Sequence, residues 1–93
     1  ILKKENIMSV AELNINLNTN EDADELVKSY TENAPGEFPE AKQLLQIRVN
    51  DKTVMAISLY SNNEAMERAS VARTKRMDLK KDNFSSVDTK FAR

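Results

Sequence analysis

The chain has 93 residues, a net charge of −1, 40% hydrophobic and 31% charged residues, and neither cysteine nor histidine. This length fits one domain, and the composition is that of a soluble globular protein. Without cysteine and histidine, disulfides, thiolate nucleophiles and a structural zinc site are excluded, and the near-neutral charge gives no field that would recruit nucleic acid or an anionic membrane.

The start of the sequence carries neither a membrane span nor the apolar core of a signal peptide. No apolar run reaches the roughly 18 residues that a spanning helix needs. We therefore expect a cytoplasmic protein. The sequence begins with Ile1, and Met8 stands just before the first patterned segment. Residues 1–8 are accordingly expected to be an N-terminal tail, and residues 9–93 a single domain.

The first part of this domain has the pattern of a strand followed by a helix. Apolar residues alternate with polar ones over residues 9–18, which predicts a strand with one buried face. Thr19 or Asn20 can cap the helix that follows, whose first turn is acidic. We expect this helix to end at Ala34-Pro35-Gly36.

Residues 41–50 and 53–60 are predicted to be two strands joined by a tight turn. In the first strand, Leu45, Ile47 and Val49 share one face and Arg48 lies on the other. The second strand is apolar on both faces. Whether Val54 or Met55 lies on the face of Ile47 stays open, because a slip of one residue exchanges the two faces.

The last part is predicted to be a second helix and a fourth strand. Ser61 and Glu64 have the spacing of a capping box, and the helix is expected to run to about Met77. The strand covers residues 84–93. The inner positions expected on the helix are Ala65, Met66, Ala69, Ala72 and Met77, whereas Arg68, Arg73, Lys75 and Arg76 are expected mostly to face solvent.

This order of elements predicts an α+β fold, a ferredoxin-like βαββαβ sandwich with four antiparallel strands and both helices on one face. The other face of the sheet would then carry apolar residues without cover from the same chain. Apolar patches of that size are rare on monomers. We therefore expect a homodimer in which two sheets pair their open faces.

The segment LLQIRVNDKTVMAISLYSNNEAMERAS, residues 44–70, combines an apolar strand, a short turn, a strand ending in an aromatic residue and a capped helix. It resembles the antibiotic biosynthesis monooxygenase-like superfamily of dimeric α/β barrels. The resemblance places Asn14 or Asn16 where that family has an asparagine on the first strand, and Tyr60 where it usually has a tryptophan. No histidine matches the haem ligand of the haem-degrading members, so haem degradation is not expected.

A ligand pocket is expected between the second helix and the sheet. Short alanine side chains on the helix leave room beside adaptable methionines, although they also suit close packing. An asparagine or arginine side chain would bind the polar head group of the ligand. The alternative for the asparagines is solvent exposure, and the alternative for Arg48 is a contact at the strand edge or in the dimer. Tyr60 is either a pocket wall or a core aromatic. The candidate ligand-binding residues are Asn14, Asn16, Arg48, Met55, Tyr60, Met66 and Ala69.

Two functions from different classes follow from these residues. The first is a dimeric protein that binds a small apolar or fatty-acyl-like ligand and has no clear catalytic apparatus. The second is a cofactor-independent monooxygenase-like enzyme acting on a polyketide or quinol, with Asn14 or Asn16 and Tyr60 at its site. A protein that only forms oligomers is the third possibility. We expect no cofactor and no metal ion.

Overall fold

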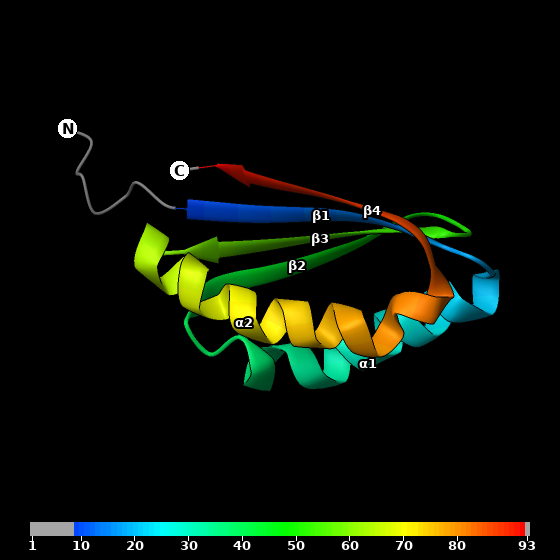
Figure 1. Cartoon of the computed structure of the whole chain (residues 1–93), viewed down its shortest axis with the longest axis horizontal. Coiled ribbons are helices and arrows are strands. Elements are labelled where there is room, and N and C mark those ends of the chain that lie inside the picture. Colours follow the sequence, from blue (N-terminus) through cyan, green and yellow to red (C-terminus); the bar gives the residue numbers. More distant parts are fainter. Residues whose placement is uncertain (1–8, 93) are drawn as a thin grey trace.

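The computed structural model describes residues 9–92, and its elements follow the predicted order (Figure 1). Both helices lie on one face of a four-stranded sheet, which confirms the α+β ferredoxin-like arrangement. The expected N-terminal tail and Met8 lie outside the described residues. The elements are β1 (Ser9–Leu17), α1 (Asn20–Glu37), β2 (Ala41–Asn50), β3 (Thr53–Tyr60), α2 (Asn63–Lys80), a 3₁₀ turn η2 (Lys81–Asn83) and β4 (Phe84–Ala92).

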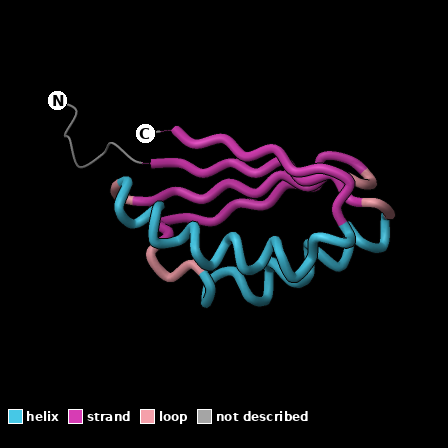
Figure 2. The backbone as a smooth tube through the Cα atoms, in the orientation of Figure 1, coloured by secondary structure: helices cyan, strands magenta, loops and turns pink. Residues whose placement is uncertain are grey.

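The strands are ordered β2-β3-β1-β4, and all neighbours are antiparallel (Figure 2). Ile15 in β1 is paired with Val54 in β3 and with Val87 in β4. Because paired residues point to the same side of a sheet, this register defines the face that packs against the helices. Leu13 and Ile15 are buried on that face.

The opposite face of the sheet is open. Ile47 pairs with Met55, which settles the register that the sequence left undecided. A register shift between Arg48 and Asn50 brings this pairing about. Leu45 and Ile47 are 40% and 47% exposed on the open face. We refer to these two residues, together with Met55 and Ile57 of β3, as the open apolar face.

Three helix boundaries differ from the prediction, one in α1 and two in α2. Helix α1 continues through Pro35 to Glu37, because the N–H of Phe38 bonds to the carbonyl of Ala34 at 2.8 Å and extends the helical ladder past the proline. Its predicted cap is confirmed, since Thr19 Oγ1 accepts from the N–H of Asp22 at 3.0 Å.

Helix α2 starts one residue later than predicted and ends later, at Lys80. The cap is Asn62, not Ser61: the side-chain oxygen Oδ1 of Asn62 accepts from the N–H of Ala65 at 2.8 Å. None of the helices within residues 9–92 has the length and apolar character required to cross a membrane.

Candidate functional site

The interior between the helices and the sheet has two apolar clusters. Tyr60 and Met66 belong to the first, which also contains Ala69, Ala11 and Phe38. The second cluster is built from β1, β3 and α1. Tyr60 is completely buried. Apolar burial of this kind stabilises the fold and needs no ligand to explain it.

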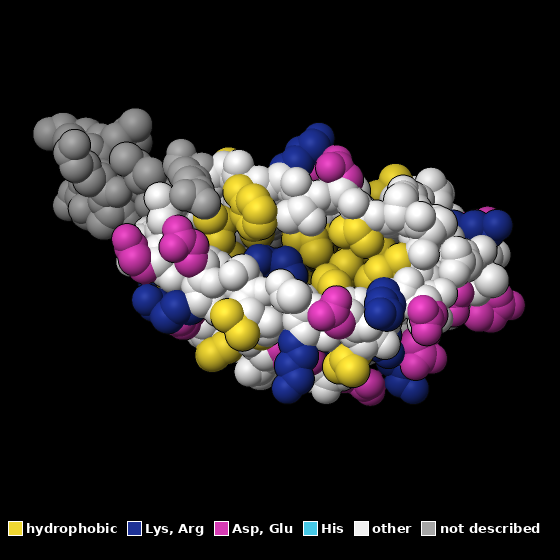
Figure 3. Space-filling model, viewed as in Figure 1, with side chains coloured by type: hydrophobic (Ala, Val, Ile, Leu, Met, Phe, Trp, Pro, Cys, Tyr) yellow, Lys and Arg dark blue, Asp and Glu magenta, His cyan; other side chains and the backbone are white. Residues whose placement is uncertain are grey.

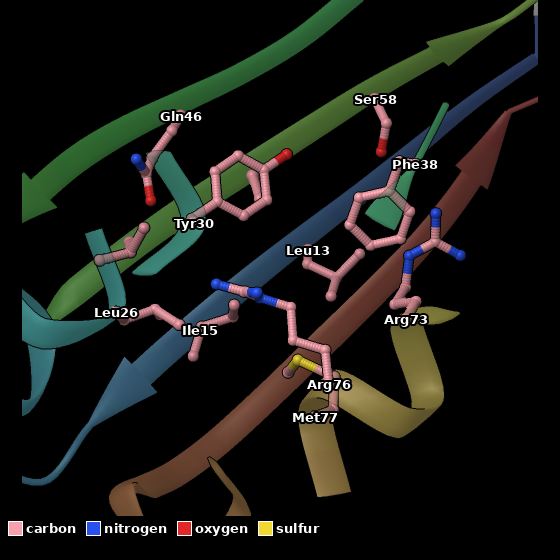
Figure 4. A pocket seen from close by; sticks show the side chains of 12 residues that line it. Leu13, Ile15, Leu26, Tyr30, Phe38, Gln46, Ser58, Arg73, Arg76 and Met77 are labelled. Atoms are coloured by element: carbon pink, nitrogen blue, oxygen red, sulfur yellow. The ribbon is translucent and has the colours of Figure 1, made fainter. Parts of the chain in front are cut away.

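Two arginines of α2 enter this interior. Arg73 and Arg76 are each only 8% exposed, so the prediction that they face solvent was wrong. They lie on the inner side because they continue the helical spacing of Met66 and Ala69, at 66, 69, 73 and 76. In Figure 4 their side chains extend from α2 toward Phe38 and Tyr30.

Arg76 is electrically compensated. Its Nη1 donates to both carboxylate oxygens of Glu37 at 2.9 Å, and its Nη2 donates to Ser29 Oγ at 3.0 Å. The guanidinium also lies over the Tyr30 ring, 5.6 Å from its centroid. This pair joins α2 to the end of α1, which assigns Arg76 a structural role.

Arg73 has no such compensation. Its Nη2 donates to the hydroxyl of Tyr60 at 3.1 Å, and its guanidinium lies 5.8 and 5.9 Å from the ring centroids of Phe38 and Phe91. Within residues 9–92 no carboxylate forms an ion pair with it, and its buried Nη1 has no hydrogen-bond partner. A buried cation with a free donor is costly unless an acceptor meets it.

The space next to Arg73 has an inner and an outer part. The inner cavity, also lined by Tyr30 and Ser58, offers only about 30 Å³ to the centre of a water molecule. That is room for roughly two waters. The outer part is a groove of about 550 Å³ between α2 and β4. Arg73 lines both, so it stands at the wall between them.

The groove, which we call the α2–β4 groove, has an apolar floor and a polar rim. The floor is formed by Leu13, Met77, Phe84, Val87 and Phe91, and the polar groups at its border include Ser70, Thr74, Asp78, Lys81 and Thr89. Figure 3 shows hydrophobic side chains exposed along this hollow, with Lys or Arg side chains beside them. A concave surface with an apolar floor and polar groups at its border is typical of small-molecule sites.

Tyr30 is held in its neutral form. Burial raises the pKa of its hydroxyl above the ordinary value of 10.0, and Tyr60 adds to the rise, while the nearby Arg76 and Arg73 act against it. A phenol with a raised pKa does not serve as a general base at neutral pH. The site therefore offers the guanidinium cation of Arg73 and the uncharged hydroxyl of Tyr30.

The residues that sequence analysis proposed as ligand contacts lie in three separate places. Asn14, Asn16 and Met55 point to the open face, away from the helices. Asn14 Nδ2 donates to Glu12 at 2.9 Å; Asn16 donates to Ser86 Oγ at 2.8 Å and accepts from Thr53 Oγ1 at 2.7 Å. These asparagines hold neighbouring groups of the sheet and do not share a cavity with Tyr60 in the protomer.

Arg48 lies at the sheet edge on the helix side. Its Nη1 bonds to Asp24 of α1 at 2.8 Å, and its other nitrogens bond to the carbonyls of Asn50 and Asp51 at 2.8 and 2.6 Å. Of the remaining candidates, Tyr60 contacts the site through Arg73, whereas Met66 and Ala69 pack in the core. Of the residues beyond Ala69 on this stripe, Arg73 and Met77 line the groove, one and two helical turns further along α2.

Sequence reasoning missed Arg73, the central residue of this site. The signal was present in the helical spacing, because position 73 lies seven residues after Met66 and four after Ala69 on the same stripe. The charge of Arg73 predicts solvent exposure, whereas its position on this stripe predicts burial.

No protein-family model matches the sequence, and no curated protein matches it either. Solved structures share the fold at low identity. A dimeric ferredoxin-like protein from an uncultured marine organism is 10% identical, with a TM-score of 0.75 over 96% of this chain and 89% of that one. A monooxygenase from Streptomyces coelicolor in complex with nanaomycin D is 12% identical, with a TM-score of 0.70 over 92% and 86%.

A protein from Chloroflexus aurantiacus, described as a putative antibiotic biosynthesis monooxygenase, is 9% identical, with a TM-score of 0.73 over 92% of this chain and 91% of that one. The fold implied by the resemblance in residues 44–70 is therefore confirmed. At these identities the likeness concerns the fold.

Proposed function

We propose that this protein is a homodimer that binds a small apolar ligand in the α2–β4 groove. The carrying observation is the groove itself, a hollow between α2 and β4 whose apolar floor is exposed (Figure 3). Its volume of about 550 Å³ falls in the range of pockets that hold small organic molecules. A fatty-acyl chain or a small aromatic body suits a floor of this composition.

The homodimer is supported by the open apolar face, which lies on the other side of the sheet from the groove. A second copy that covers this face would bury Leu45 and Ile47. The groove is lined by residues of one protomer, so it remains accessible in such an assembly. The marine protein with the same fold is described as dimeric.

Fluorescence titration with N-phenyl-1-naphthylamine, a neutral apolar probe, tests the ligand-binding proposal. We expect saturable binding to the purified protein. Thr89→Trp, at the groove wall, should fill the space and weaken binding by about tenfold or more. Val71→Trp is the matched control, because Val71 is 74% exposed on α2 and does not line the groove. Absence of binding, or equal binding by all three proteins, would contradict the proposal.

An enzyme acting on a polyketide or quinol is the second candidate function. It is favoured by one observation: a monooxygenase of this fold is known in complex with nanaomycin D. Arg73 would contact the substrate on the groove side, with Tyr60 behind it through their hydrogen bond, whereas Asn14 and Asn16 face the opposite side of the sheet. Oxygen uptake with hydroquinones that is absent, or unchanged in Asn14→Ala, Asn16→Ala and Tyr60→Phe variants, would exclude it.

A further inference from the structure

We infer that Arg73 is the anchor for the acidic head of the ligand, so that the groove selects apolar monoanions, carboxylates in particular, over neutral molecules of the same shape. This inference rests on the proposed function. It adds the chemical class of the ligand and the residue that selects it. Its basis is the incomplete hydrogen bonding of the buried Arg73 guanidinium.

The first step is the incomplete bonding of the guanidinium. Arg76, three residues along the same helix, meets the carboxylate of Glu37 with one nitrogen and Ser29 with another. Arg73, buried to the same extent, has only one hydrogen-bond acceptor, the hydroxyl of Tyr60. Its Nη1 stays without a partner among residues 9–92. A cation in that state is stabilised by an anion that arrives from outside the chain.

The second step is how the guanidinium is held. The bond from Nη2 to Tyr60 fixes one side, and the rings of Phe38 and Phe91 lie near the cation at 5.8 and 5.9 Å. Cation–π contacts of this kind hold an arginine without neutralising its charge. Because Nη1 is shielded from water, an oxygen that bonds to it does so in a low-dielectric setting, where the bond is strong.

The third step is the charge of the groove as a whole. Its lining contains two cations, Arg73 and Lys81, and one anion, Asp78, which leaves a net charge of +1. Asp78 and Lys81 lie near the rim, three residues apart along the chain, and their opposite charges cancel in this sum. A single negative charge on the ligand balances the charge of Arg73, whereas a doubly charged phosphate would leave one negative charge unbalanced in the groove. The remaining floor requires an apolar body attached to that charge.

The test compares decanoic acid with 1-decanol as competitors of N-phenyl-1-naphthylamine at pH 8, where the acid is ionised. We expect wild type to release the probe at an acid concentration about tenfold lower than the alcohol concentration, as suits a hydrogen bond to a charged group. In Arg73→Gln this preference should disappear while the alcohol competes as before. Arg73→Lys should retain part of it.

Lys81→Gln removes the rim cation of the groove and leaves Arg73, so it tests whether the rim makes the selection. We expect most of the preference for the acid to remain in this variant. Circular dichroism establishes that each variant is folded, and the wild-type comparison of acid with alcohol stands even where a variant is not. Equal competition by acid and alcohol in wild type would overturn the role of Arg73 and leave the proposed function intact.

A preference for the acid that survives Arg73→Gln but is lost in Lys81→Gln would assign the selection to the rim, and the inference would be wrong. If wild type does not bind the probe, or neither competitor displaces it, the proposed function fails and this inference fails with it. Loss of the acid preference alone would therefore contradict the role of Arg73, whereas loss of probe binding would contradict the proposed function.

Discussion

Arg73 and Arg76 lie on the same side of α2 with the same burial, yet their electrostatic surroundings are opposite. Arg76→Met would leave the carboxylate of Glu37, which is about one-third exposed, without its partner. We expect a loss of about 2 kcal/mol in the free energy of unfolding, between the values for buried and surface pairs. Arg73→Met removes an uncompensated cation along with one hydrogen bond, and should stay within about 1 kcal/mol of wild type. Urea denaturation followed by circular dichroism measures both.

Lys75→Met is the control for this comparison, because Lys75 lies between the two arginines and is exposed. A change at such a surface position is usually within about 0.5 kcal/mol. Should Arg73→Met cost as much as Arg76→Met, the guanidinium of Arg73 would be a structural group and not a binding one. The contrast between the two arginines is therefore informative before any ligand is known.

Tyr30 gives a pH dependence of stability whose sign follows from its surroundings. The pKa of its hydroxyl is raised in the folded protein, chiefly by burial. As pH rises past 10, the unfolded chain loses this proton while the folded protein keeps it, so the free energy of unfolding falls. Tyr30 thus stabilises the fold fully below pH 10 and loses that contribution as the pH rises through its folded value.

Urea unfolding of wild type and Tyr30→Phe between pH 8.5 and 11 tests this. Both proteins will change as lysines titrate, so the difference between them is the relevant quantity. We expect the wild-type stability to fall more steeply above pH 10 than that of Tyr30→Phe. Parallel curves would show that the hydroxyl of Tyr30 is not sheltered from water in the folded protein.

At the scale of single elements, the start of α2 offers a direct comparison of two adjacent residues. The sequence predicts Ser61 as the cap, whereas in the structure Asn62 bonds to the N–H of Ala65 at 2.8 Å. We expect Asn62→Ala to lower the free energy of unfolding by about 1 kcal/mol. Ser61→Ala should have little effect, and Asn62→Ser should recover most of the loss. Thermal or urea unfolding is the measurement, and a larger loss at Ser61 would reverse the assignment.

The strands were the most predictable elements, because their period-two pattern assigns faces directly. Leu45 and Ile47 share the open face as predicted, and the helix-facing side of β1 is buried as predicted. The register shift between Arg48 and Asn50 leaves Val49 without a paired residue in β3, so its predicted place on that face is not confirmed. The pairing of Ile47 with Met55 required the structure, since the register shift before Asn50 leaves no mark in the sequence. Local pattern fixes the face within a strand, whereas pairing depends on the geometry of the turn.

The candidate site was less predictable than the fold, because it depends on contacts between elements far apart in sequence. The place was predicted in general terms, between the second helix and the sheet. The residues at its centre were not, since Arg73 was assigned to solvent from its charge. Its partners Phe38, Tyr60 and Phe91 come from three other parts of the chain. Such a cluster exists only in the folded molecule.

At the scale of the whole molecule, two apolar surfaces lie on opposite sides of the sheet. The α2–β4 groove is concave, which suits a small ligand, whereas the open apolar face is formed by the adjacent strands β2 and β3. Sheets commonly pack face to face across such surfaces, about 10 Å apart. A stable dimer interface buries on the order of 800 Å² from each partner, and its centre is depleted in charged residues.

Ile47→Glu places a charge on the open apolar face, where Ile47 is 47% exposed and paired with Met55. If two copies pair through this face, the variant must bury two unpaired carboxylates in the contact, and we expect monomers at micromolar concentration where wild type sediments as a dimer. Val71→Glu makes the same kind of change on the outer side of α2, at a position 74% exposed, and should remain dimeric. A monomeric wild type would refute the assembly but leave the groove in place, because every residue that lines it comes from one chain. Dimers in both variants would instead mean that the copies meet through a different surface.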